Sequence, residues 1–138
     1  MEVDVLTDIE IDRPRSEVAD YASNPDNATA WYENIKKVEW KSPKPLEVGS
    51  KVAFEAQFMG QKLEYTYEIT EFIPGEWLVM TTTSGPFEME TSYKFSDTQS
   101  GGTKMELRNR AHDPAMASAI ERENRKDLAR LKSVLESS

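Results

Sequence analysis

The chain has 138 residues, a length that fits one domain over residues 1–138 and allows a core without disulfides. It has no cysteine and a single histidine, His112, which excludes thiolate zinc sites and histidine-built metal centres; we expect no metal and no cofactor, and any metal site would need oxygen ligands alone. The net charge of -8 repels phosphate backbones and anionic bilayers, so nucleic acid is not an expected partner.

A half-buried strand is the first predicted element, over residues 2–12. Apolar and acidic residues alternate along it, and one face carries Val3, Val5, Thr7, Ile9 and Ile11. Two short helices should follow. The first spans residues 16–22 and ends before Asn24-Pro25. The second, capped by Asp26 or Asn27, has one buried face made of Ala30, Trp31, Asn34 and Ile35.

The middle of the chain is predicted to be an antiparallel meander. After a short extended stretch at residues 38–40, the pattern from residue 50 to residue 111 has a period of two. Turn signals at residues 59–61, 73–75, 84–86 and 100–102 divide it into strands of hairpin-compatible spacing. With the first strand this makes seven strands with one apolar face.

The last segment, residues 114–138, changes to helical spacing. Asp113 is a suitable N-cap and Pro114 a suitable first residue of a long helix. Its apolar stripe consists of Met116, Ile120, Leu128, Leu131 and Leu135. Asn124 and Asp127 fall inside this stripe, so they either have buried partners or border a cavity.

These elements predict an α+β fold in which a curved seven-stranded antiparallel sheet wraps around the C-terminal helix. Such a sheet can enclose more volume than one helix fills, and several of its inward positions are polar. We therefore expect a cavity with its mouth near Met59, residues 85–87 and Met116. The predicted ligand-binding residues are Phe54, Phe58, Tyr65, Tyr67, Phe87, Met89, Thr91, Tyr93, Asn109, Met116, Ile120 and Asn124.

Two residues are candidates for acid or base catalysis in this cavity, Asp127 and His112. Each also has a structural interpretation. Asp127 has basic neighbours, Lys126 and Arg130, with which it could form an ion pair, and His112 precedes Asp113-Pro114, where an exposed loop is expected. The sequence contains no nucleophile elbow, phosphate loop or dinucleotide fingerprint.

The whole chain resembles the START and polyketide cyclase (SRPBCC) superfamily. The resemblance lies in the order of the elements and in residues 11–18, Asn24-Pro25-Asp26-Asn27 with Trp31, residues 48–51, residues 67–75, residues 84–87 and residues 101–105. It implies a helix-grip fold with a hydrophobic cavity under the C-terminal helix. Members of the superfamily carry lipids, quinones, plant hormones or polyketides, and a minority catalyse cyclisation or dehydration.

Three functions therefore remain open: binding of a small hydrophobic molecule, cofactor-free cyclisation or dehydration, and a protein-interaction module of the chaperone-activator type. The sequence has neither an export signal at its start nor a run of about 18 apolar residues, so we expect a cytoplasmic protein without a membrane span. A monomer or a homodimer is expected.

Overall fold

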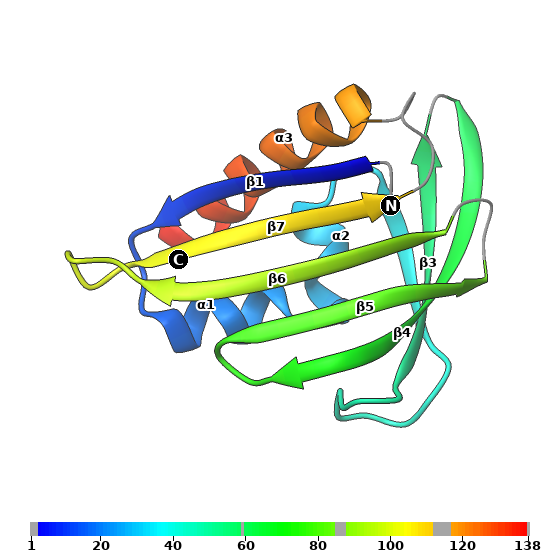
Figure 1. Cartoon of the computed structure of the whole chain (residues 1–138), viewed down its shortest axis with the longest axis horizontal. Helices are drawn as coiled ribbons and strands as arrows, with labels where there is room; N and C mark the ends of the chain where they lie inside the picture. The colour runs from blue at the N-terminus through cyan, green and yellow to red at the C-terminus, as the bar shows by residue number, and fades with distance from the viewer. Residues whose placement is uncertain (1–2, 59, 85–87, 112–116, 138) are drawn as a thin grey trace.

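The strands form one seven-stranded antiparallel sheet in the order β1-β7-β6-β5-β4-β3-β2, and three helices cover its concave face (Figure 1). A computed structural model describes residues 3–58, 60–84, 88–111 and 117–137, without the side chains of Phe58 and Ser84. The strands are β1 (Val3–Ile11), β2 (Ile35–Trp40), β3 (Lys51–Phe58), β4 (Gln61–Ile73), β5 (Trp77–Ser84), β6 (Met89–Asp97) and β7 (Thr103–Ala111). The helices are α1 (Arg15–Ala22), the 3-10 turn η1 (Pro25–Asn27), α2 (Ala28–Trp31) and α3 (Ala117–Glu136).

The first strand extends the open sheet by pairing with β7 and not with its sequence neighbour β2. Val3 lies opposite Ala111 and Ile11 lies opposite Thr103, so the first and last strands match over their whole length. In Figure 1 the strands β1, β7, β6 and β5 run side by side, while β3 and β4 turn away at a steep angle. This curvature produces the predicted wrapped sheet.

The second short helix is briefer than predicted. Asn24 accepts a hydrogen bond of 3.1 Å from the backbone N–H of Asp26 and caps η1, and α2 then ends at Trp31. Ala28 and Trp31 form its buried face, whereas Ala30 is exposed. The prediction that Asn34 and Ile35 continue this helix is wrong, because Ile35 already pairs with Ala56 as the first residue of β2.

Helix α3 packs against the sheet mainly through its second half. Its sequence is rich in Ala, Glu, Arg, Lys and Leu and contains neither glycine nor proline, which favours an uninterrupted helix. Leu128, Leu131 and Leu135 enter the main core, where Met105 and Leu107 of β7 are fully buried. Ile120 belongs to a separate, smaller cluster with Val3, Val5 and Ala111. The predicted cap at Asp113 and Pro114 lies outside the described residues.

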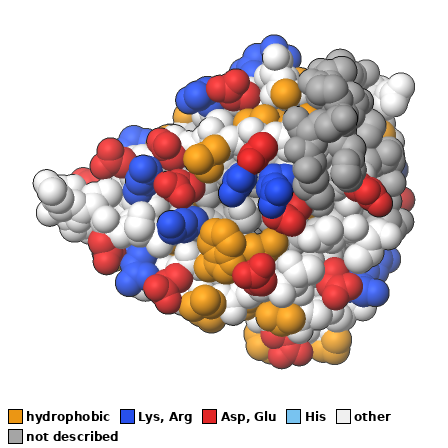
Figure 2. All heavy atoms as spheres, viewed as in Figure 1, with side chains coloured by type: hydrophobic (Ala, Val, Ile, Leu, Met, Phe, Trp, Pro, Cys, Tyr) orange, Lys and Arg blue, Asp and Glu red, His pale blue; other side chains and the backbone are white. Residues whose placement is uncertain are grey.

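The opposite face of the sheet is exposed and of mixed charge. Figure 2 shows acidic and basic side chains intermingled over this face around a few apolar patches. Arg110 of β7 forms an ion pair of 3.8 Å with Glu90 of β6 here, and Lys104 forms one of 3.6 Å with Glu106 of the same strand. Among the helices that the structure describes, none is both long and apolar enough to cross a membrane.

Candidate functional site

A cavity of about 170 Å³ lies between the first half of α3 and the concave face of the sheet. It exists there because the leucines of α3 fill only the other end of the sheet with core side chains. The strands β3 to β7 contribute the wall residues Phe54, Ala56, Tyr65, Tyr67, Met80, Met89, Thr91, Tyr93 and Asn109. The segment after α2 contributes Tyr32, Asn34 and Ile35, and α3 contributes Ile120, Glu123, Asn124 and Asp127.

Strand register brings these wall residues together. Phe54 lies opposite Tyr65 in the β3–β4 pair, and Thr91 lies between Met80 of β5 and Asn109 of β7. Side chains alternate between the two faces along a strand, and residues paired directly across neighbouring strands point to the same face. These paired residues therefore all lie on the concave face. The edge-on contact of Phe54 with Tyr67, at 5.7 Å between ring centroids, makes much of this wall aromatic.

A chain of buried amides and hydroxyls crosses the cavity from helix to sheet. Asn124 donates a hydrogen bond from Nδ2 to Oδ1 of Asn109, and Asn109 donates from its own Nδ2 to the Thr91 hydroxyl at 2.8 Å. All three residues are buried. Asn124 thus borders the cavity and also has a buried partner, so both interpretations of its inward position are correct.

Two tyrosine hydroxyls meet on the same wall. The hydroxyl oxygens of Tyr32 and Tyr93 are 2.6 Å apart, and the fully buried Trp31 holds Tyr32 by a ring contact of 4.0 Å. Burial raises the pKa of both phenols well above the usual range, and it raises the pKa of Tyr67 to about 12, so all three remain protonated near neutral pH. One hydroxyl of the pair donates to the other, which leaves one O–H for another acceptor.

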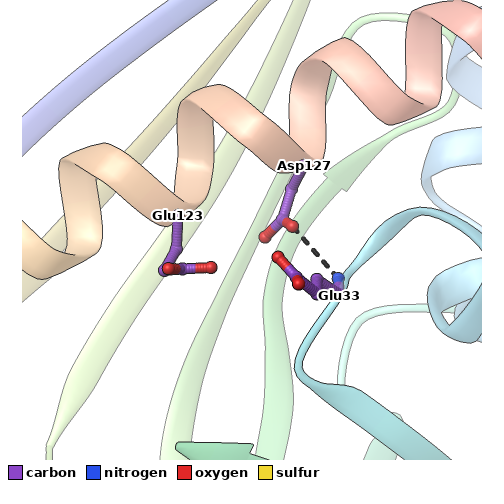
Figure 3. Close-up of side chains that lie close together, drawn as sticks. All are labelled: Glu33, Glu123 and Asp127. Atoms are coloured by element: carbon purple, nitrogen blue, oxygen red, sulfur yellow. Dashed lines mark hydrogen bonds between the residues drawn. The ribbon is translucent and has the colours of Figure 1, made fainter.

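Three carboxylates converge at the side of the cavity next to α3. Figure 3 shows Glu33, Glu123 and Asp127 directed toward one another, and their oxygens lie within 4.8 Å. Oδ1 of Asp127 accepts a hydrogen bond of 3.0 Å from the backbone N–H of Glu33. Glu123 is held by Asn34, whose Nδ2 donates to it at 3.4 Å. Among the residues described, this is the group whose oxygen atoms could hold a metal ion.

Asp127 does not form the ion pair that its basic neighbours suggest. Lys126 lies 3.9 Å from Glu123 instead, and Asp127 is only 3% exposed. Desolvation therefore raises the pKa of Asp127 to about 6, the carboxylate of Glu123 adds to the rise, and the hydrogen bond from Glu33 opposes it. A carboxyl group with such a pKa can exchange protons near neutral pH.

The structure places many of the predicted residues on the cavity wall. These are Phe54, Tyr65, Tyr67, Met89, Thr91, Tyr93, Asn109, Ile120, Asn124 and Asp127. Phe87, Met116, His112 and the proposed mouth at Met59 and residues 85–87 lie outside the described residues, as does the side chain of Phe58. Whether the wall residues bind a ligand stays a prediction.

Sequence reasoning missed Tyr32, Asn34, Ile35, Ala56, Met80 and Glu123 as wall residues. The first three fall in the stretch predicted as the second short helix. The observed helix α2 ends at Trp31, before all three of them. Ala56 and Met80 do occupy inward positions of the period-two pattern and could have been found from it. Glu123 lies at the edge of the α3 stripe and gave no signal of its own.

Comparisons with known proteins agree with this architecture. A family model described as polyketide cyclase / dehydrase and lipid transport matches residues 2–136. Among solved structures, TTHA0849 from Thermus thermophilus superposes with a TM-score of 0.79 at 17% identity, over 98% of this chain and 99% of that one. No curated protein sequence matches the chain.

Two further structures share the fold. DynU16, from the dynemicin biosynthetic locus, has a TM-score of 0.76 at 14% identity, over 96% of this chain and 47% of its own. Ara h 8.0201 has a TM-score of 0.75 at 11% identity, over 98% of both chains. At such identities the likeness establishes the helix-grip fold.

Proposed function

Because the chain belongs to the polyketide cyclase / dehydrase and lipid transport family, we propose that it binds a small, mostly hydrophobic molecule in the cavity between α3 and the sheet. The observation that carries this proposal is the composition of the wall. Aromatic and aliphatic side chains make up most of it, and a few buried polar groups converge on it from facing elements. Small-molecule sites in proteins commonly combine these two features.

The buried polar groups would orient the ligand. The Tyr32–Tyr93 pair has one O–H to donate, which suits a carbonyl or hydroxyl oxygen of the ligand. The Asn124–Asn109–Thr91 chain stiffens an adjoining part of the wall. The phenol pair and this chain give the ligand fixed polar contacts inside a largely apolar volume.

A cofactor-free cyclase or dehydratase is the second candidate, and one observation favours it. Asp127 has a pKa raised to about 6 and lines the same cavity as Tyr32 and Tyr93, so a base and an O–H donor border one space. A carboxylate could remove a proton next to a carbonyl while the phenol stabilises the developing oxyanion. His112 remains a weaker candidate outside the described residues.

A protein-interaction module needs no internal cavity, so the cavity argues against the chaperone-activator alternative. We propose further that the protein acts in the cytoplasm as a monomer or homodimer. Nucleic acid is disfavoured as a partner by the net charge of -8.

Native mass spectrometry of the protein purified from its own host tests ligand binding directly. We expect a retained small molecule in the wild type. Ala56→Phe should expel it by filling the cavity, whereas Ala53→Phe, on the other face of β3, should not. Absence of any retained molecule, together with no NMR shift changes at the cavity wall on adding toluene, would contradict the proposal.

A further inference from the structure

The charge around the cavity has one sign. Glu123 and Asp127 line the cavity, and the carboxylate of Glu33 approaches both of them. Among the wall residues that the structure describes, none is lysine, arginine or histidine. A ligand that carries a carboxylate or phosphate would therefore meet only like charge, at a cost that increases in the low dielectric of a cavity.

One oxygen of Asp127 lacks a partner within the described part of the chain. The side chain is 3% exposed, and Oδ1 accepts the hydrogen bond from the backbone N–H of Glu33. No second hydrogen bond or ion pair to Asp127 is present among the described residues. Because Asp127 lines the cavity, a group inside the cavity can reach its carboxylate. A cationic group there would give this carboxylate a direct charge partner.

The nearby basic side chains that the structure describes form no ion pair with Asp127. Lys126 lies beside Glu123 at the surface. Arg130, an exposed residue of the next turn of α3, lowers the pKa of Asp127 through its charge but makes no contact ion pair with it. Neither residue lines the cavity. A positive charge in direct contact with Asp127 inside the cavity could thus come from a ligand.

The wall beside the carboxylates suits an organic cation. Asp127 accepts a hydrogen bond from Glu33, the residue after Tyr32, and the Tyr32 hydroxyl is 2.6 Å from that of Tyr93, so two aromatic rings share the cavity wall with the carboxylate. Ring faces attract ammonium groups and also pack against hydrocarbon. Since an apolar cavity of about 150 Å³ accommodates benzene, the cavity of about 170 Å³ has room for one ring with a short side chain.

A bare divalent cation fits the same carboxylates less well. Calcium requires about six to eight oxygen ligands, and magnesium keeps most of its water. Here one oxygen of Asp127 is already used by a backbone amide, and the adjoining wall is aromatic. An aromatic wall adds nothing to metal binding, whereas it would contact the body of an amine.

We propose that the cavity selects a small organic amine that carries an aromatic ring. Its ammonium group would pair with Asp127 and Glu123, and its ring would pack against Tyr32 and Tyr93. This inference rests on the proposed function, because it names the ligand class of the same cavity. The pairing gives Asp127 a countercharge in direct contact, which none of the described residues provides. It also makes the ligand preference opposite to that of a fatty-acid carrier.

Three probes that share one hydrocarbon body test the inference: 2-phenylethylamine, 2-phenylethanol and 3-phenylpropanoate. They differ in carrying a cationic, neutral or anionic end group. Titration calorimetry at pH 7.5 should give an affinity for the amine about tenfold higher than for the alcohol, as expected for one charge-assisted hydrogen bond. The carboxylate should bind more weakly than the alcohol.

Variants assign this preference to the cavity. Asp127→Asn should reduce the preference for the amine over the alcohol about tenfold, while it keeps an acceptor for the Glu33 amide. Glu121→Gln makes the same charge change on the exposed face of α3, where Glu121 pairs with Arg125 at 3.0 Å, and should change nothing. Ala56→Phe should abolish binding of both probes, which separates the cavity from nonspecific attraction to a protein of charge -8.

The outcomes distinguish this inference from the proposed function. Equal affinities for amine and alcohol, or an amine preference that survives Asp127→Asn, would overturn the inference and leave cavity binding intact. Calcium chloride that displaces the amine at equal concentration would overturn it in favour of a metal site. Binding of none of the probes would overturn both.

Discussion

The carboxylate of Asp127 accepts a hydrogen bond of 3.0 Å from the backbone N–H of Glu33, and this contact ties the middle of α3 to the segment after α2. The two residues are 94 positions apart in the sequence. The contact gives one Asp127 oxygen a partner and leaves the other without a hydrogen bond among the described residues. It thereby turns a residue of an ordinary amphipathic helix into the most perturbed carboxyl group of the wall.

Asp127→Asn should stabilise the protein at high pH and have little effect at low pH. The folded-state pKa of Asp127 is raised from 3.8 to about 6, so its contribution to stability is complete below pH 3.8 and is lost as the pH rises through 6. With allowance for solvent screening at the cavity, we expect a gain of about 2 kcal/mol at pH 8. Urea unfolding of both proteins from pH 4 to pH 8 measures it. A difference that does not vary with pH would contradict the assigned pKa.

Asn124→Leu should destabilise the protein. The change removes the donor to Asn109 and leaves the buried Oδ1 of that residue without its partner. An orphaned buried acceptor costs about 1 to 3 kcal/mol. Equilibrium urea denaturation measures the loss. A neutral or stabilising effect would mean that water in the cavity serves Asn109 as well as Asn124 does.

The hydroxyls of Tyr32 and Tyr93 should be energetically coupled. Either Tyr→Phe change leaves the other hydroxyl without its 2.6 Å partner, while the double change removes both. We expect a coupling free energy of about 1 kcal/mol in a double-mutant cycle. Tyr65→Phe is the matched control, because its hydroxyl makes no hydrogen bond among the described residues. Strict additivity of the two changes would show that the pair contributes nothing.

Replacing apolar side chains of α3 with alanine should cost more stability in its second half, which packs in the main core, than in its first half, which borders the cavity. Leu131→Ala removes a fully buried side chain from the main core and should cost about 2 to 5 kcal/mol. Ile120→Ala removes a side chain that already borders the cavity and loses fewer contacts, so its cost should be lower by at least about 1 kcal/mol. Chemical denaturation of both variants tests the order. Equal costs would argue that the two ends are equally well packed.

Several features of the fold could be read from local patterns. The period of two from residue 50 to residue 111 predicted the meander, and the change to helical spacing predicted α3. The inward positions of Thr91, Tyr93 and Asn109 follow from the same alternation, because a strand has only two faces. The pattern failed after α2, where Trp31 and Ile35 are equally compatible with a helix and with a turn into a strand.

The sequence by itself determined the order of the elements, the face that each strand and α3 would bury, and therefore the location of a cavity under the helix. Only the tertiary structure decided which polar groups meet there. The 2.6 Å contact of Tyr32 with Tyr93 and the approach of Glu33 to Asp127 each join segments more than 60 residues apart. Periodicity reports the direction of a side chain relative to its own element, whereas such pairings depend on how the elements dock. The approach of Glu33 to Glu123 and Asp127 at the cavity follows from docking alone.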